Sequence, residues 1–532
     1  MHLSDRSPAT KAGAAIVATA ILLVAILLAR LILTQGRPGI LAQDVDLPAA
    51  GLVLVSVVFG LWLTRQPRSI SIPDATNRWL LVAAFVVFGL LAAATLVVFG
   101  TSPAAPDEQA ALFQARLFSE FKIIGQYPAG LVDHMLAPAF KNSIILVGDD
   151  GRTMSAYWPG WALLMTPFVW LGAPWLLGPA MGGLGVFLVG KLATVLQGAQ
   201  AATVAVLLTV TSGAFVLNAM SLYPAGGHMT LSLLFAWLLL RGGSRDYVLA
   251  GLVGSLALVL NNPYPHAVFA LPWGLWLLFS SERRRRLIPL AIGYVPGLMT
   301  LAGWVLLQNT LKTLDSTAAA HVWLGHVSLL VTIPNITNLG DRLEELIRVW
   351  AWGAPGLLVL AGIGWWFTRG RIGLRLLGAS FVSTVLLYWL YPGGQGLGYG
   401  ARYYQVAWGA LPILAAILIV TPGWERLRNF AMAAALVGLV VVVPLEMSYA
   451  HGLATVSAVP LSQLRGPGAN LCFVDFDQVP APGITMNNNP STQGDLVLIS
   501  QGPEADQALV KTWFPGARLV SQTSFGSCYD RP

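Results

Sequence analysis

The chain has 532 residues, of which 56% are hydrophobic and only 10% are charged. A soluble protein of this length needs far more charge to cover its surface, so the composition predicts a polytopic α-helical membrane protein. The formal net charge of +7 is expected to reflect basic residues at membrane boundaries, and a nucleic-acid-binding surface is not indicated. Two cysteines exclude a disulfide-rich scaffold and a cysteine-rich metal site.

Three apolar segments precede the first large polar loop. The first covers residues 12–33 and is not followed by a small-residue cleavage site, so we expect a retained span rather than a cleaved signal peptide. Residues 49–63 and 79–99 follow, which makes residues 1–99 a region of three membrane spans. Basic residues before the first segment, and between the second and third, favour a cytoplasmic amino terminus under the positive-inside rule.

Basic residues continue to mark one side of the membrane farther along the chain. The clusters at residues 241–245, 283–286, 369–375 and 426–428 all separate apolar segments. If every cluster is cytoplasmic, the number of crossings between residues 99 and 241 must be odd. Four apolar segments lie there, and residues 158–171 are the weakest because they contain prolines and interfacial aromatic residues. We expect that segment to be re-entrant or interfacial, which gives about 13 spans in total.

After Met447 the sequence loses its membrane character. NLCFVDF, DLVLIS and ARLVS predict strands and GPEADQALVKTWF predicts a helix, so residues 447–532 are expected to form a small α/β domain. The span count places this domain on the extracytoplasmic side of the membrane, where oxidising conditions permit a disulfide between Cys472 and Cys528. Two free thiols in a reducing compartment remain the alternative.

Ionisable side chains are rare within the predicted spans, and Arg30, Lys191 and Glu446 lie towards segment ends. A proton-coupled transporter or pump should carry carboxylates or histidines in mid-span, so the sequence disfavours this class. Polar residues instead gather in predicted outer loops. These are residues 100–157, residues 308–349 within the membrane core of residues 158–446, and the glycine-rich YPGGQGLGYGARYYQ. A site at the outer face of the membrane would be built from these loops.

The first outer loop begins with PDEQ, and two explanations of Asp107 and Glu108 are open. Proline and acidic residues favour the first turn of a helix, and apolar residues from Ala110 to Ile124 recur at helical spacing. Capping of an amphipathic helix along the outer interface can therefore account for both carboxylates. Alternatively, the loop holds them at the membrane surface, where a lipid phosphate would lie.

Other polar residues of the outer loops have competing explanations. IILVGDDGRTMSAY predicts two short strands joined by a turn, which explains Asp149 and Asp150 better than metal binding does. His321 and His326 are spaced awkwardly for one helix face, so a zinc site is not favoured. Arg402 ends the glycine-rich loop, where it suits either phosphate recognition or anchoring at the membrane interface.

In the order of these motifs, the chain resembles the C-type (GT-C) glycosyltransferases that use polyprenyl-phosphate sugars. It is most similar to the branch of the protein O-mannosyltransferases and the aminoarabinose transferase of lipid A. PDEQAALFQARLF resembles the acidic motif and amphipathic helix that open the first outer loop of this family. DDGRTMSAYWPGWALL is similar to its Gly-Arg and Tyr-Pro-Pro-Gly motif, and GARYYQVAWGALPIL to its Arg-Tyr before a proline-containing span.

The resemblance implies an enzyme that moves a sugar, with inversion, from a polyprenyl-phosphate donor to a lipid, glycan or protein acceptor. The reaction would take place at the outer face of the plasma (inner) membrane. Asp107 would act as general base, and Glu108 would orient it or contact the acceptor. Four basic residues are expected to bind the donor phosphate: Arg402, Arg152, Lys141 and His134. Four further side chains are expected to line the substrate: Tyr157, Tyr403, His228 and His266.

No cofactor is implied, and no nucleotide-binding loop is visible in the sequence, which suits a lipid-linked donor. The sequence offers no cage for a divalent metal, so none is expected to be essential. Two rival functions from other classes remain. A flippase or other transporter would move a lipid-linked sugar without forming a glycosidic bond. A non-catalytic membrane scaffold of the same fold would bind a partner through its outer tail.

Overall fold

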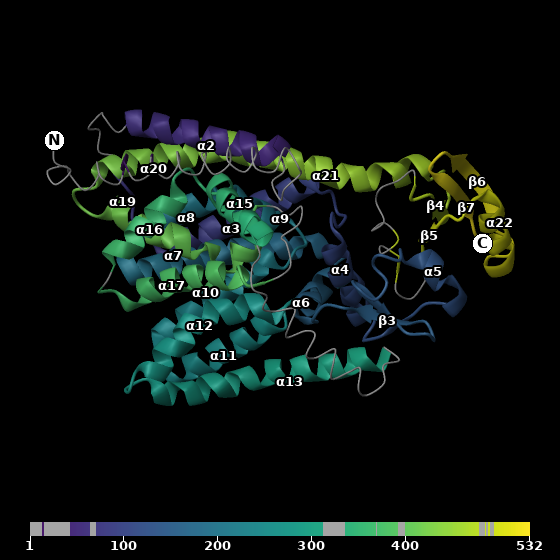
Figure 1. Cartoon of the computed structure of the whole chain (residues 1–532), viewed down its shortest axis with the longest axis horizontal. Coiled ribbons are helices and arrows are strands. Elements are labelled where there is room, and N and C mark those ends of the chain that lie inside the picture. The colour runs from purple at the N-terminus through teal and green to yellow at the C-terminus, as the bar shows by residue number, and fades with distance from the viewer. Residues whose placement is uncertain are drawn as a thin grey trace.

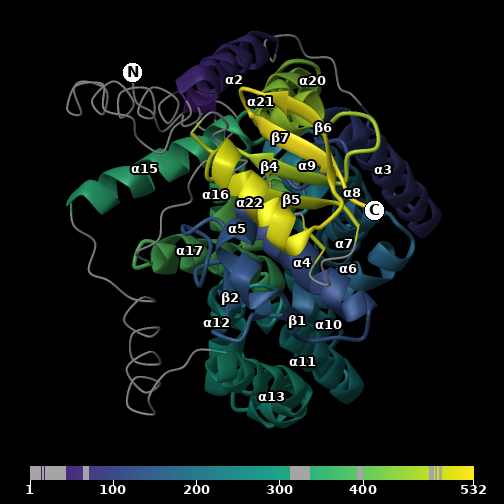
Figure 2. The ribbon, with the colours of Figure 1, turned by 90° about the vertical axis from the view of Figure 1, so that its right-hand side faces the viewer.

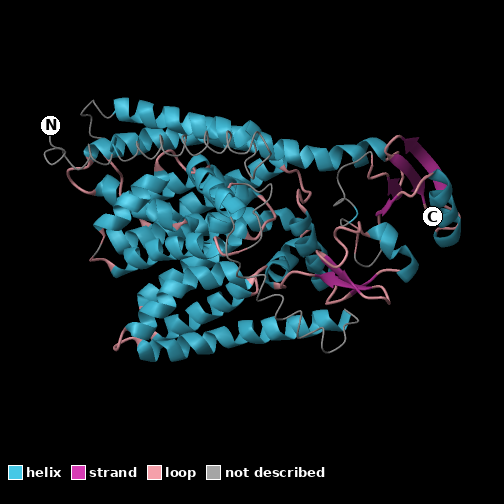
Figure 3. Cartoon of the chain, in the orientation of Figure 1, coloured by secondary structure: helices cyan, strands magenta, loops and turns pink. Residues whose placement is uncertain are grey.

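The computed structural model describes residues 13–14, 17, 43–63, 71–311, 336–368, 370–391, 400–477, 485, 488–489 and 494–532. In these parts the chain forms a helical body with two small β-sheets at one end (Figures 1 and 3). Most of the first predicted span lies outside the described residues, as do His321 and His326.

The described residues form long and short helices. Those before the 312–335 gap are α2 (Gln43–Leu63), α3 (Asn77–Val98), α4 (Pro106–Ser119), α5 (Val132–Met135), α6 (Gly160–Trp170), α7 (Leu177–Gln197), α8 (Ala199–Val210), α9 (Gly213–Met220), α10 (Ala225–Arg241), α11 (Ser244–Leu258), α12 (Pro263–Phe279) and α13 (Leu287–Leu311). Those after it are α15 (Ile336–Ala351), α16 (Leu357–Phe367), α17 (Ile372–Tyr388), η5 (Arg402–Tyr404), α18 (Gln405–Trp408), α19 (Ala410–Val420), α20 (Glu425–Val437), α21 (Val443–Leu464) and α22 (Pro503–Trp513).

Four helical segments of the described chain are long and apolar enough to cross a membrane: Asn77–Val98, Pro174–Gln197, Arg284–Leu311 and Leu427–Thr455. Two bent pairs, α8 with α9 and η5–α18 with α19, bring the number to six if each pair is one span. Helices α10, α12 and α17 have 17 residues each, fewer than the roughly 20 that a straight crossing needs. The 13 predicted spans therefore stay a prediction.

The outer faces of α3 and α13 are apolar and exposed. Phe85 and Leu90 of α3 are 73% and 65% exposed, and Ile288 and Met299 of α13 are 65% and 70% exposed. Both helices lie at the periphery of the helical body (Figure 2). Apolar surface of this extent is unfavourable in water and favourable against lipid, so the chain is a multi-pass membrane protein.

Residues 202–217, one of the four apolar segments predicted between residues 99 and 241, are not one continuous span. The segment breaks between α8 and α9 with a bend of 67°. The hydroxyl of Ser212 donates to the carbonyl of Leu208 at 2.7 Å and accepts from the N–H of Ala354 at 3.0 Å. The N–H of Ala214 donates to the carbonyl of Trp352 at 2.9 Å. A neighbouring segment thus satisfies the backbone groups that the break releases, as a break at membrane depth requires.

The position of Glu446 differs from the expectation that it lies towards a segment end. It falls inside the segment Leu427–Thr455 and is completely buried. Its carboxylate packs against Gly213, the first residue of α9, where any side chain would overlap it. A helix amino terminus is a favourable place for a buried negative charge, because unpaired N–H groups and the helix dipole meet there.

Two sheets lie at the same end of the molecule (Figure 3). The first has the order β1-β3-β2 and contains β1 (Gly125–Gln126), β2 (Ile145–Val147) and β3 (Arg152–Ser155). β2 and β3 are antiparallel around a turn, as IILVGDDGRTMSAY predicts.

The second sheet has the order β5-β4-β7-β6 and lies after α21. Its strands are β4 (Leu471–Val474), β5 (Leu496–Ile499), β6 (Arg518–Thr523) and β7 (Gly526–Asp530). β4 and β5 run parallel, and α22 follows β5. A disulfide joins Cys472 of β4 to Cys528 of β7, directly opposite each other in the sheet.

Helix α4 lies between the helical body and the second sheet. Ala110, Phe113 and Leu117 share one buried core with side chains of β4, β5 and β7. The opposite face of α4, including Leu112 and Ala115, packs against α6 and other helices of the body. Packing on both faces fixes the direction in which the first turn of α4 points.

Candidate active site

Asp107 and Glu108 lie in the first turn of α4 but have different surroundings. The Glu108 carboxylate accepts the N–H groups of Ala104 and Ala105 at 2.6 and 3.3 Å. It is 1% exposed, and burial raises its pKa to about 7 although the two hydrogen bonds lower it. Glu108 therefore caps the amino terminus of α4, which is the capping explanation given above for this carboxylate. Glu108 is not among the residues that line the cavity described below.

The Asp107 carboxylate is held by three residues from distant parts of the chain. The Tyr157 hydroxyl, from the β3–α6 connection, donates to Oδ1. The Tyr223 hydroxyl, from the α9–α10 connection, donates to Oδ2 at 2.9 Å. Nη1 of Arg402, at the start of η5, lies 3.5 Å from Oδ2. Burial and the neighbouring Asp107 charge raise the pKa of Tyr157, so its hydroxyl stays protonated as a donor.

These side chains surround a cavity of about 160 Å³. Its lining comprises Asp107, Tyr157, Tyr223, Pro224, Ala225, His228, Asn261, Asn262, Pro265, Tyr388, Tyr391, Arg402, Tyr403 and Val406. A cavity of about 150 Å³ is known to hold one benzene molecule, so this space admits a single six-membered ring. In this lining of described residues, the charged side chains are Asp107 and Arg402.

Aromatic rings hold the Arg402 guanidinium and form one wall of the cavity. The guanidinium carbon lies 4.6 Å from the ring centre of Tyr223 and 5.7 Å from that of Tyr403. Tyr403 stacks on Tyr388 at 4.8 Å and meets Tyr391 edge to face at 5.7 Å. Cation–π contacts and ring stacking restrict the rotamers of Arg402, so the guanidinium is oriented before any ligand binds.

His228 lies in this cavity, as predicted for a substrate-lining residue. It is 4% exposed, and its Nδ1 has no hydrogen-bond partner among the described residues. His266 lies behind the lining, because its Nε2 contacts the Tyr294 hydroxyl at 2.7 Å and the neighbouring Pro265 faces the cavity instead.

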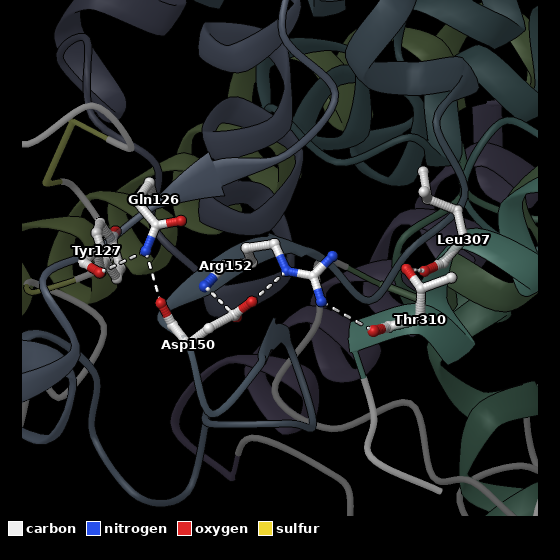
Figure 4. A network of polar contacts seen from close by, with 6 residues as sticks. All are labelled: Gln126, Tyr127, Asp150, Arg152, Leu307 and Thr310. Carbon is white, nitrogen blue, oxygen red and sulfur yellow. Dashed lines mark hydrogen bonds and ion pairs between the residues drawn. The ribbon is translucent and has the colours of Figure 1, made fainter.

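Arg152 is not in the cavity lining, and Figure 4 shows its contacts elsewhere. Its Nε pairs with the Asp150 carboxylate at 2.6 Å, and its Nη2 donates to the carbonyl of Thr310 at 3.2 Å. The Arg152 backbone N–H and guanidinium lower the pKa of Asp150. Gln126 also donates to the Asp150 carbonyl. This network ties the β2–β3 turn to the end of α13, so the phosphate-binding role predicted for Arg152 has no support in its position.

Lys141 and His134 also lie outside the cavity lining. Lys141 forms an ion pair with Asp133 at 2.7 Å on the surface. His134 belongs to α5, which contacts β5 of the second sheet. Both residues lie at the sheet end of the molecule, so their predicted contacts to donor phosphate stay a prediction.

Five polar residues of the lining were not predicted from the sequence: Tyr223, Asn261, Asn262, Tyr388 and Tyr391. Tyr223 and Tyr388 stand at the ends of apolar segments, where the local pattern indicates a helix end and no more. A usable signal was the gathering of tyrosines on both sides of the glycine-rich loop. Within the described residues, no group of three or more His, Cys, Asp or Glu side chains lies close enough together to hold a metal ion.

The geometry combines a carboxylate that can accept a proton with an oriented guanidinium that can bind an anion. Both face one ring-sized space with tyrosine, asparagine and histidine side chains around it. The chemistry that this combination suits is attack by a hydroxyl group with departure of an anionic leaving group.

No protein-family model matches the sequence, and no curated protein matches it. Solved structures match in fold. The crystal structure of ArnT from Cupriavidus metallidurans bound to undecaprenyl phosphate gives a TM-score of 0.53 at 13% identity, over 86% of this chain and 98% of that chain. The apo state of the same protein gives 0.49 at 14% identity, over 84% and 97%.

A third match is the cryo-EM structure of the arabinosyltransferase EmbB from Mycobacterium smegmatis, with a TM-score of 0.39 at 14% identity over 82% of this chain and 46% of that chain. The match to ArnT carries the conclusion: the GT-C fold that the resemblance implied is confirmed. At 13% identity the likeness concerns the fold alone.

Proposed function

We propose that the protein transfers a sugar from a polyprenyl-phosphate donor to an acceptor hydroxyl at the outer face of the membrane. The observation that carries the proposal is the meeting of Asp107 and Arg402, 295 residues apart, in one ring-sized cavity. The fold around this cavity matches that of ArnT, which was crystallised with undecaprenyl phosphate.

Asp107 acts as the general base. An acceptor hydroxyl takes the place of one of the tyrosine hydroxyls on the carboxylate and gives up its proton as its oxygen attacks the anomeric carbon. The bond between this carbon and the phosphate oxygen breaks on the opposite side, so the sugar is transferred with inversion. A base positioned in this way contributes about 10²–10⁴-fold to the rate.

Arg402 stabilises the leaving group. The donor phosphate carries one negative charge as a diester and gains a second when the sugar departs. The Arg402 contact to Asp107, at 3.5 Å, is long for an ion pair, so a phosphate oxygen can compete for the guanidinium. An oriented cation that meets charge as it develops lowers the barrier more than one that must first reorganise.

The sugar ring occupies the space beside these two groups. Tyr388 and Tyr391 offer apolar ring faces, and Asn261 and Asn262 offer amides for sugar hydroxyls. The Nδ1 atom of His228, unpaired among the described residues, offers a further partner. The acceptor is a lipid, a glycan or a protein.

The topology proposed for this reaction places the cavity and both sheets outside the plasma (inner) membrane. Helix α13 begins after Arg283–Arg286, and its other end contacts β3 through Arg152 and Thr310. Basic residues at one end and sheets at the other fit a cytoplasmic amino terminus and an extracytoplasmic carboxyl terminus. A disulfide between Cys472 and Cys528 suits that compartment.

Transfer is further proposed to need no cofactor and no divalent metal. The one carboxylate in the described lining already accepts bonds from two tyrosines and lies beside a guanidinium, so Arg402 supplies the positive charge that the leaving phosphate needs. Turnover that survives EDTA treatment is the expected result, and loss of turnover restored by Mg²⁺ or Mn²⁺ contradicts it.

The rival function is transport of a lipid-linked sugar, and the buried Glu446 within a candidate span favours it. Its place against Gly213 at the amino terminus of α9 gives it a structural role as well. The two functions differ in product, because an enzyme forms a new glycosidic bond and a transporter does not.

The experiment that tests the proposed function compares the envelope glycans of cells with and without the gene by mass spectrometry. The proposal expects one sugar modification to disappear and its lipid-linked donor to accumulate, and the purified protein should then form the same bond in vitro. Unchanged glycans, together with movement of the lipid-linked sugar across sealed vesicles, would establish the transporter instead. Restoration of the modification by an Asp107→Asn protein would favour the non-catalytic scaffold.

A further inference from the structure

Helix α15 carries a group of buried charges directly behind the tyrosine wall of the cavity. Arg342, Glu344, Glu345 and Arg348 are each at most 3% exposed. Burial of a charge is costly unless it is paired and hydrogen-bonded. The partners of these side chains therefore show what α15 holds in place.

Two of these residues contact the chain on either side of residues 392–399, at Tyr391 before them and at Tyr404 after them. The Arg342 guanidinium pairs with the Glu345 carboxylate and donates to the carbonyl of Tyr391 at 2.5 Å. The Glu345 carboxylate also accepts the hydroxyl of Tyr404 at 2.5 Å. Tyr391 lies just before residues 392–399 and Tyr404 lies after them. The Arg342–Glu345 ion pair therefore bonds to the chain on both sides of these residues.

The chain on both sides of residues 392–399 also supplies the part of the cavity that holds Arg402. Tyr391, Arg402 and Tyr403 all line the cavity, and the rings of Tyr391 and Tyr403 meet edge to face. Tyr404 is next in sequence, is completely buried, and faces α15 instead. The short helical turn η5 thus presents Arg402 to the cavity and Tyr404 to the ion pair.

We infer that Arg342 and Glu345 are positioning residues for the phosphate-binding guanidinium. They act as a clamp, through Tyr391 and Tyr404, that sets where Arg402 stands relative to Asp107. The inference rests on the proposed function, in which Arg402 binds the donor phosphate. A buried ion pair is weak evidence for stability, whereas its directional bonds to the chain on both sides of residues 392–399 fix the geometry there.

The test is a double-mutant cycle on the full-length protein in lipid nanodiscs, with undecaprenyl phosphate as the probe. Tyr404→Phe removes one hydroxyl and leaves the Arg342–Glu345 pair intact. It is expected to raise the Kd for undecaprenyl phosphate about tenfold in the unaltered protein, since a bond to a charged group is lost. In an Arg402→Ala background the same substitution should change the Kd less than about twofold, because the residue through which it acts is gone.

A matched control is Tyr294→Phe. It also removes a tyrosine hydroxyl bonded to a buried partner, His266, but Tyr294 is itself partly buried and stands outside the cavity lining and the clamp. The Kd of the Tyr294→Phe protein for undecaprenyl phosphate should stay within about twofold of that of the unaltered protein. Glu345→Gln is a second variant of the clamp and should show the same dependence on Arg402 as Tyr404→Phe.

The outcomes separate the clamp from the proposed function. An equal loss of affinity with and without Arg402, or no loss from either clamp variant, overturns the clamp and leaves the proposed function standing. Failure of the unaltered protein to bind undecaprenyl phosphate, or equally tight binding by Arg402→Ala, overturns both. Loss of affinity only where Arg402 is present, with an unaffected Tyr294→Phe control, supports the clamp.

Discussion

Asp107 and Glu108 are neighbouring carboxylates whose side chains perform separate tasks. Glu108 turns inward and satisfies the N–H groups of Ala104 and Ala105, which a helix amino terminus leaves unpaired. That bond pattern leaves Asp107 on the side facing Tyr157, Tyr223 and Arg402. The cap thus orients the first turn so that the second carboxylate faces the cavity.

The pH dependence of stability should reveal the buried carboxyl of Glu108. Its pKa of about 7 in the fold lies above the ordinary 4.5, so the native state binds more protons than the unfolded state between these values. The contribution of Glu108 to stability is therefore fully present below pH 4.5 and is lost as the pH rises through 7. The loss amounts to about 3 kcal/mol at most.

Glu108→Gln should remove this dependence, because an amide oxygen still accepts the two N–H bonds but does not titrate. The measurement is the unfolding midpoint in detergent at pH 5 and pH 8 for both proteins. The variant should gain stability relative to the parent as the pH rises. Parallel changes in the two proteins would mean that Glu108 does not titrate in this range.

At the scale of elements, α4 joins the helical body to the second sheet. Phe113 is 1% exposed in the core that α4 shares with β4 and β5. Phe121, two residues beyond the end of α4, is 89% exposed. The two phenylalanines therefore form a matched pair for testing whether the second sheet supports α4.

Phe113→Ala should cost about 3–5 kcal/mol of stability, since it opens a cavity between α4 and the sheet. It should also reduce glycosyl transfer, because the direction of the first turn depends on that packing. Phe121→Ala should leave the unfolding midpoint and the activity near those of the parent. Similar midpoints for the two variants would show that α4 does not depend on the shared core.

The sequence predicted α4 well at its start and less well at its end. Pro106 and the acidic pair marked the first turn, and the buried face of Ala110, Phe113 and Leu117 follows the helical spacing. The spacing continues to Phe121 and Ile124, yet the helix ends at Ser119 and Phe121 has a φ of 57°. The spacing of apolar residues does not by itself predict where a helix ends, because the end also depends on local backbone geometry.

The structure brings some of the predicted site residues together in the cavity and leaves others outside it. Asp107 and Arg402 stood in ordered motifs, and the structure brings them into one cavity. Arg152 stands in the Gly-Arg motif and Lys141 in no motif, but each pairs with a nearby acid of the same outer loop and lies outside the cavity lining. The α8–α9 break was also missed, because Ser212 needs a partner from a distant segment to stabilise it.

At the scale of the whole molecule, the disulfide reports the compartment of the second sheet. Mass spectrometry of protein taken from native membranes under non-reducing conditions should find Cys472 and Cys528 linked. The crosslink spans 56 residues, and its removal by Cys472→Ala with Cys528→Ala should cost about 4 kcal/mol in the chain-entropy description. Two free thiols in native protein would contradict both the crosslink and the extracytoplasmic location.

The helical body, α4 and the second sheet together place the Asp107 carboxylate beside the Arg402 guanidinium in one cavity of a membrane protein. The measurement that tests this account most directly is the turnover of an Asp107→Asn protein, alongside its binding of undecaprenyl phosphate. The account predicts a loss of transfer of at least about 10²-fold, with the phosphate-binding affinity largely kept. Turnover near that of the unaltered protein would contradict the assignment of Asp107 as the general base.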